Sequence, residues 1–73
     1  MYTIRYNHRS PESATSLEAA KRIVRREAGV SRLSLYPATD AVYCWRSAAD
    51  QAADSDGSRA YATIESDAQR AQH

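Results

Sequence analysis

Residues 15–29, TSLEAAKRIVRREAG, hold the pattern around which the rest of the chain is organised. Thr15 and Glu18 have the spacing of a capping box, in which a threonine and a glutamate side chain accept backbone hydrogen bonds at a helix start. Gly29 stands where a left-handed residue ends a helix. Apolar residues recur between them at spacings of three and four, and comprise Leu17, Ala20, Ile23, Val24 and Ala28. The stretch predicts an amphipathic helix of about three to four turns that packs one face on a core.

The outer face of this helix is basic. It carries Lys21, Arg22, Arg25 and Arg26, although the formal charge of the whole chain is only +1. Residues 1–32 hold seven basic and three acidic side chains, net +4, whereas residues 33–73 hold three basic and six acidic ones, net −3. A solvated outer face is the default for a surface helix and accounts for these residues as well as a binding surface does. The divided charge also favours an oriented encounter with a charged partner.

Segments on both sides of the helix alternate in the way of half-buried strands. They are residues 2–7, 32–36, 41–47 and 59–65. The HRSPESA segment, with Pro11, predicts a loop, and PATD at 37–40 predicts the turn of a hairpin. The small, acidic segment 48–58 predicts a long hairpin loop with room for one helical turn.

These elements together predict one α+β domain over residues 1–65, with a single amphipathic helix on an antiparallel sheet in the order β-α-β-β-β. Residues 66–73 are expected to form a C-terminal tail or a short helix. A chain of 73 residues buries only about 60% of its unfolded surface, so the core must be thin. The predicted core consists of Ile4, Leu17, Ala20, Val24, Leu33, Leu35, Val42 and Ile64.

A single helix covers only one face of such a sheet, which leaves the other face open. Alternation places there Thr3, Arg5, Ser34, Tyr36, Tyr43, Trp45 and Tyr61. Tyr, Trp and Arg are enriched in protein-binding hot spots, and aromatic rings also stack on the bases of single-stranded nucleic acid. Alternatively, these rings only cover the edges of a thin core. A shift of the register by one residue would invert the whole assignment.

No set of side chains converges on catalysis, so we expect no enzyme, no catalytic residue, no metal site and no cofactor. The DSDG segment lacks the acidic first and twelfth positions of a calcium loop, where Ala52 and Thr63 stand. His8 and His73 have no partners at metal-ligand spacing. Asp54 and Asp56 fall in a predicted open loop, which does not favour acid–base work.

Cys44 is the only cysteine, so no internal disulfide can form and a reducing cytoplasm is the expected setting. We expect Cys44 itself to be a small buried residue of a strand. The amino terminus, MYTIRYNHRS, has no apolar signal-peptide core, and no run of residues is long enough to span a bilayer. The sequence therefore predicts a protein with no export signal and no membrane partner.

The strand, capped basic helix and following strands resemble small phage-encoded anti-CRISPR proteins that inhibit type I (Cascade) surveillance complexes. The matching residues are Ser16, Leu17, Ala20, Lys21, Arg22 and Ile23, and the likeness in layout covers roughly residues 1–65. The resemblance implies a non-enzymatic inhibitor that binds the crRNA-guided complex in the cytoplasm of a host bacterium and blocks its engagement of target DNA. Within the family, we expect a type I-C target. The acidic segment 48–58 departs from the compact hairpins of such inhibitors.

Of the functional residues of that family, only Lys21 and Arg22 carry over by motif. The charge pattern and the aromatic face extend the predicted partner-binding set to Arg5, Lys21, Arg22, Arg25, Arg26, Tyr43, Trp45 and Tyr61. The alternative function is a small nucleic-acid-binding module that uses the aromatic and basic sheet face. The near-neutral charge of the chain departs from the strongly basic composition of most nucleic-acid binders, and favours a protein partner.

Overall fold

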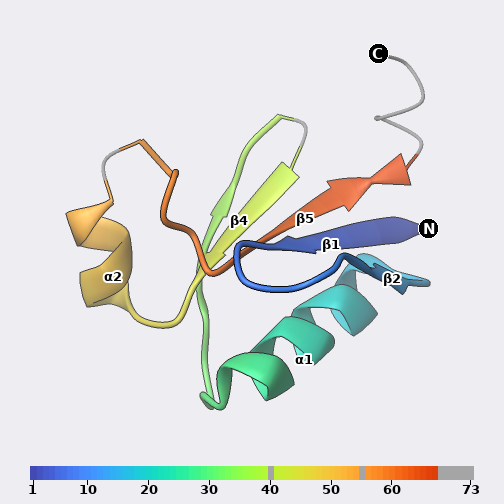
Figure 1. Cartoon of the computed structure of the whole chain (residues 1–73), viewed down its shortest axis with the longest axis horizontal. Coiled ribbons are helices and arrows are strands. Elements are labelled where there is room, and N and C mark those ends of the chain that lie inside the picture. Colours follow the sequence, from blue (N-terminus) through green and yellow to red (C-terminus); the bar gives the residue numbers. More distant parts are fainter. Residues whose placement is uncertain (40, 55, 68–73) are drawn as a thin grey trace.

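The computed structural model describes residues 1–39, 41–54 and 56–67. In this part of the chain, one long helix lies along one face of a five-stranded antiparallel sheet, and a shorter helix lies beyond the ends of the strands (Figure 1). The helices are α1 (Leu17–Ala28) and α2 (Ala48–Ala53). The strands are β1 (Tyr2–Tyr6), β2 (Glu12–Ala14), β3 (Ser34–Pro37), β4 (Ala41–Trp45) and β5 (Ala62–Ser66), in the spatial order β2-β1-β5-β4-β3. The α+β class and the helix-on-sheet layout are confirmed.

Helix α1 begins one residue later than the capping-box pattern predicts. Ser16, not Thr15, is the N-cap: its backbone is extended, and its Oγ accepts a hydrogen bond from the Ala19 amide at 3.1 Å. Either hydroxyl can cap a helix, and with Ser16 as the N-cap the first helical residue is Leu17. The predicted end is correct, because Gly29 has φ +70° and its amide donates to carbonyls of the last turn. Neither α1 nor any other helix in the described residues is long and apolar enough to cross a membrane.

The predicted loop HRSPESA contains a strand that sequence patterning missed. Residues of β2 pair with β1 at the edge of the sheet, with Tyr2 opposite Ala14 and Ile4 opposite Glu12. Three residues are too few to show an alternation, so the sequence pattern predicts a loop here. Pro11 precedes the strand, a position that needs no amide donor.

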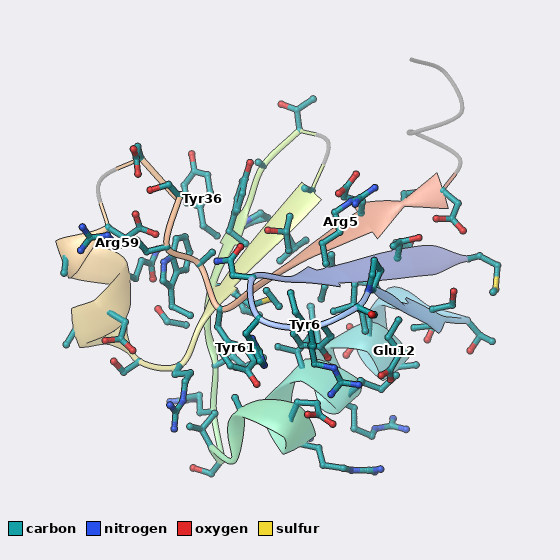
Figure 2. All side chains as sticks on the ribbon, viewed as in Figure 1. Arg5, Tyr6, Glu12, Tyr36, Arg59 and Tyr61 are labelled. Atoms are coloured by element: carbon teal, nitrogen blue, oxygen red, sulfur yellow. The ribbon has the colours of Figure 1, made fainter. Side chains whose placement is uncertain are left out.

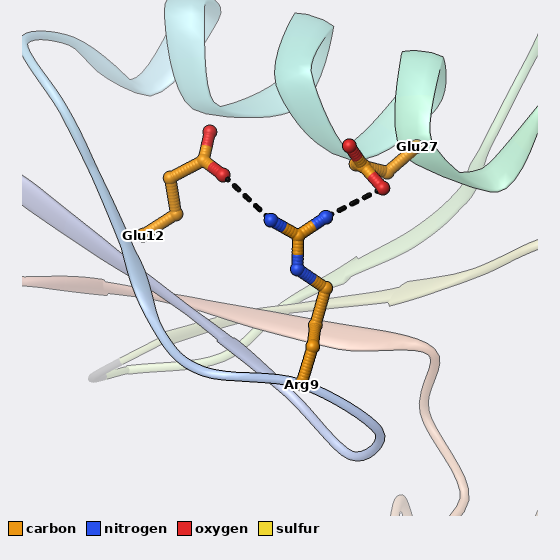
Figure 3. Close-up of polar contacts among 3 residues, drawn as sticks. All are labelled: Arg9, Glu12 and Glu27. Carbon is orange, nitrogen blue, oxygen red and sulfur yellow. Dashed lines mark hydrogen bonds and ion pairs between the residues drawn. The ribbon is translucent and has the colours of Figure 1, made fainter.

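Arg9 fastens the turn between β1 and β2 onto α1 (Figure 3). Its guanidinium lies 3.3 Å from the Glu12 carboxylate and 2.6 Å from that of Glu27 on α1. The same guanidinium stands 5.0 Å from the centre of the Tyr6 ring. The hydrogen bond and charge of Glu27 raise the pKa of Arg9 further above its ordinary value. This clamp joins the short edge strand to the helix.

The core lies between α1 and the sheet. Ile4, Ala20, Val24 and Ile64 are buried as predicted. The other predicted core residues are partly buried and pack against that cluster: Leu17, Leu33, Leu35 and Val42. Cys44 is buried in β4 as expected, and burial raises the pKa of its thiol to about 12.

Tyr61 lies on the side of the sheet opposite to the one predicted. Strand β5 starts at Ala62, so the alternation assumed from residue 59 does not hold at Tyr61. The Tyr61 ring packs edge-on against Tyr6, with centres 5.9 Å apart, and lies 5.1 Å from the His8 ring. Figure 2 shows Tyr6 and Tyr61 on the α1 side of the sheet and Arg5 on the other side. Tyr61 therefore extends the core edge and does not join an open aromatic face.

Tyr6 itself is buried, and this burial raises the pKa of its phenol to about 12. Its hydroxyl finds no hydrogen-bond partner among the described residues. The ring is instead held by aromatic edges and by the Arg9 guanidinium.

The segment predicted as a long loop forms α2 and a turn after it. Ser47 caps α2 by accepting a hydrogen bond from the Asp50 amide at 3.1 Å, yet no residue of α2 is buried. At the other end of the chain, Asp67 accepts a hydrogen bond from the Thr3 hydroxyl at 2.7 Å. The predicted tail beyond this point, residues 68–73, lies outside the described residues.

Candidate functional site

A basic groove opens where α1 leaves part of the sheet uncovered. Helix α1 packs mainly on β1, β2 and β5, and the groove lies toward the β3 side. Its volume is about 370 Å³. The residues that line it are Glu18, Lys21, Arg22, Arg25, Ser31, Arg32, Leu33 and Leu35. The groove therefore combines one face of the helix, the chain reversal after it and the edge of the sheet.

The chain reversal at Gly29 builds the second wall of this basic groove. The positive φ of Gly29 turns the backbone, and the Val30 amide donates back to the Arg25 carbonyl at 3.4 Å. This turn returns Arg32 to the side of the helix, and half-buried Leu33 and Leu35 then enter the sheet. A basic wall and an apolar floor result from the same turn.

The charges of the basic groove are largely uncompensated. Lys21 lies 3.6 Å from Glu18, a pair exposed enough to contribute little. Arg22, Arg25 and Arg32 form no ion pair with any residue in the described part of the chain. Cationic groups gathered in a concave surface produce a positive potential that attracts anionic ligands.

The edge of β3 borders the same groove. Strand β3 is the last in the sheet order, so among the described strands it pairs only with β4. An unpaired edge presents backbone N–H and C=O groups to a partner. The basic groove thus lies beside a backbone edge that a partner segment can reach.

The opposite face of the sheet carries a different surface, the acidic aromatic pocket. Its volume is about 450 Å³, and it is lined by Tyr36, Tyr43, Trp45, Gln51, Asp54, Asp56 and Gly57. Tyr36 is 55% exposed, but Trp45 is only 4% exposed. The Trp45 indole donates a hydrogen bond to Asp54 Oδ2 at 2.9 Å.

The predicted open aromatic face is therefore wrong in part. Tyr36 and Tyr43 belong to it, but Trp45 is buried and Tyr61 lies on the other side. The cause is the turn after α2, which returns Asp54 to the indole and closes over Trp45. Sequence alternation gives the face of a residue, whereas burial depends on a segment nine residues further along the chain.

Arg5 does not join the basic residues of α1. It lies on the face of the sheet away from the helix (Figure 2), where its Nε is 2.6 Å from a Glu65 oxygen. The neighbouring carboxylate compensates its charge. Arg5 serves the pairing of β1 with β5 rather than a shared binding surface.

The predicted partner-binding set is thus divided between four places. Lys21, Arg22 and Arg25 share the basic groove, whereas Arg26 is exposed on α1 but does not line it. Arg5, Tyr43 and Trp45 occupy the opposite face, and Tyr61 the core edge. Sequence reasoning missed Arg32 as a groove residue. Its signal was a basic residue shortly after the helix-ending Gly29, placed to return toward the basic face.

No family model, no curated protein and no solved structure matches this chain.

Proposed function

We propose that this protein is a non-enzymatic binding module that docks onto an anionic partner surface through the basic groove. The observation that carries the proposal is the convergence of Arg22, Arg25 and Arg32 without carboxylate partners among the described residues. Arginine donates in a planar fork that suits carboxylates and phosphates, and each such contact is stronger when the partner is charged. The half-buried Leu33 and Leu35 add an apolar floor.

The first candidate partner is a bacterial type I CRISPR surveillance complex, and the subtype to test before the others is type I-C. The resemblance of the capped basic helix to anti-CRISPR proteins supports this choice. A crRNA-guided complex carries the anionic phosphates of its guide RNA, and a basic groove complements them. Bound there, the protein acts as a stoichiometric inhibitor that blocks the engagement of target DNA in the bacterial cytoplasm.

Free nucleic acid is the second candidate ligand, now through the basic groove rather than the aromatic face. The aromatic face is a poor base-stacking platform, because Trp45 is buried and Asp54 and Asp56 repel phosphates. The three unpaired arginines suit a phosphate backbone. This ligand predicts an affinity that falls steeply with salt as counterions are released.

The decisive experiment compares two charge variants in binding to purified type I-C complex. The groove variant carries Arg22→Gln, Arg25→Gln and Arg32→Gln, and a control carries the single change Arg26→Gln on the same helix, outside the groove. We expect the groove variant to associate more slowly and to lose most of its salt dependence, because steering charges act on the association rate. The control variant should bind as the unchanged protein does.

Two results would overturn parts of this proposal. Equal association of the groove variant and the unchanged protein would remove the basic groove as the docking surface. If the unchanged protein neither binds the complex nor prevents its binding of target DNA in a gel shift, the surveillance complex is not the partner. A gel shift with single-stranded and duplex DNA alone, at low and high salt, then tests the nucleic-acid alternative.

A further inference from the structure

The acidic aromatic pocket is built from four parts of the chain that meet on the face away from α1. Tyr36 comes from β3, and Tyr43 and Trp45 come from β4. Gln51 of α2 accepts a hydrogen bond from the Ser34 hydroxyl, which ties the helix to the sheet. Asp54, Asp56 and Gly57 form the fourth side, and Figure 2 shows Tyr36 facing it.

Tyr36, Tyr43 and Trp45 form the aromatic wall of the pocket. Tyr36 stands directly opposite Tyr43 in the pairing of β3 with β4, and the Tyr43 and Trp45 ring centres are 6.2 Å apart. Gly57 lies beside the Tyr43 ring, and a Cβ there would make only an ordinary contact with it, at 3.8 Å from a ring carbon. The φ of +78° at Gly57 is what favours glycine in this turn. The face of an aromatic ring attracts a cation.

The opposite wall is acidic. Asp54 is buried, and its Oδ2 accepts hydrogen bonds from the Trp45 indole and from the Arg59 amide at 2.8 Å. Asp56 is exposed, and its Oδ1 accepts from the Ser58 amide at 3.0 Å. Neither carboxylate forms an ion pair with a described basic side chain. Hydrogen bonds from the Ser58 backbone and side chain hold the pKa of Asp56 below its ordinary value, so Asp56 is charged at neutral pH.

Two carboxylates facing aromatic rings select a planar cation. A guanidinium group can stack on a ring and still donate paired hydrogen bonds to a carboxylate, whereas an ammonium group is a point charge without a flat face. The acidic wall repels inorganic phosphate and the phosphates of nucleotides. The net charge of −3 on residues 33–73 acts in the same direction.

We propose that the acidic aromatic pocket binds an arginine side chain presented by a partner polypeptide, stacked on Tyr36 and Tyr43 and hydrogen-bonded to Asp56. This second site does not depend on the basic groove, because the two lie on opposite faces of the sheet. A protein with both sites can hold an anionic surface on one face and an arginine-bearing segment on the other.

The test uses the single tryptophan of the chain as a probe within the pocket. The short peptide acetyl-Gly-Arg-Gly-amide is titrated into ¹⁵N-labelled protein, and the indole N–H signal of Trp45 is followed by NMR. The same peptide with citrulline or lysine in place of arginine serves as the ligand control. We expect a saturable shift at millimolar peptide with arginine only, because citrulline lacks the charge and lysine lacks the planar fork.

Variants then assign the effect to the two walls. Asp56→Asn and Tyr36→Ala should each lower the affinity for the arginine peptide by about tenfold. The first removes a charge-assisted hydrogen bond, and the second removes a stacking surface. Both side chains are exposed, so the fold should persist, and its circular dichroism is checked. Tyr36→Phe keeps the ring and should bind normally, as should Glu18→Gln, an equal charge change in the basic groove.

Three results would overturn this assignment. One is the absence of a saturable arginine shift in the unchanged protein. Another is equal binding of the citrulline or lysine peptide, which would remove the guanidinium specificity. The third is a folded Asp56→Asn or Tyr36→Ala variant that binds arginine as tightly as the unchanged protein. Loss of surveillance-complex binding by the groove variant, with peptide binding intact, would leave this site standing on its own.

Discussion

The two faces of the sheet are covered in different ways. On one face, α1 packs along the strands and buries apolar side chains such as Val24 and Ile64. Beside the other face, α2 lies beyond the ends of the strands and buries no residue of its own. Polar contacts hold it there, namely Ser34 with Gln51 of α2 and Trp45 with the C-cap residue Asp54. A periodic apolar face needs only the correct spacing of residue types, whereas a polar attachment needs particular partners. This difference explains why the covering of the α1 face could be predicted from the sequence and the covering of the other face could not.

The largest effect should come from the core beneath α1. Ile64 lies directly between Ile4 of β1 and Val42 of β4, and its side chain is fully buried. Ile64→Ala should reduce the free energy of unfolding by about 2 to 5 kcal/mol, which can unfold so small a domain. The control is Thr63→Ala, on the opposite face of the same strand. Denaturant unfolding followed by circular dichroism measures both, and equal losses would contradict the assigned core face.

A smaller loss should follow from removing the polar attachment on the other face. Asp54→Ala leaves the buried Trp45 indole N–H and the Arg59 amide without their acceptor. We expect a loss of about 1 to 3 kcal/mol, with red-shifted Trp45 fluorescence and stronger quenching by acrylamide. Asp56→Ala removes a hydrogen bond to the Ser58 amide but none to the indole, and serves as the control. Unchanged quenching of Trp45 in Asp54→Ala would mean that the hydrogen bond does not hold this cover closed.

The smallest loss of stability should come from the N-cap of α1, and it tests which residue begins the helix. Ser16→Ala should cost about 0.5 to 2 kcal/mol of stability, because the Ala19 amide loses its side-chain acceptor. Thr15→Ala should change stability little, since Thr15 is exposed and precedes the cap. Thermal unfolding of the two variants separates the alternatives. A larger loss for Thr15→Ala would restore the capping box predicted from the sequence.

The candidate sites, like the fold, divide into features that local spacing predicts and features that depend on contacts between separate segments. The basic face of α1 was visible in the sequence, because helical spacing alone gathers Lys21, Arg22 and Arg25. Arg32 was missed, since its place beside them depends on the turn at Gly29. Of the acidic aromatic pocket, the sequence predicted only the aromatic residues Tyr36, Tyr43 and Trp45 on one face of the sheet. The sequence predicts an open loop around Asp54 and Asp56, whereas Asp54 is buried against Trp45.

The sequence by itself determined the helix, its ending at Gly29, the hairpin of β3 and β4, and which face of β1, β3, β4 and β5 is turned toward the core. These features follow from local spacing, since side-chain direction repeats with the period of each element. Only the tertiary structure decided the pairing of β2 with β1, the clamp of Arg9 on Glu27, the inward place of Tyr61 and the burial of Trp45. Each of these depends on contacts between residues whose proximity no spacing rule encodes, because it arises only when separate elements pack together.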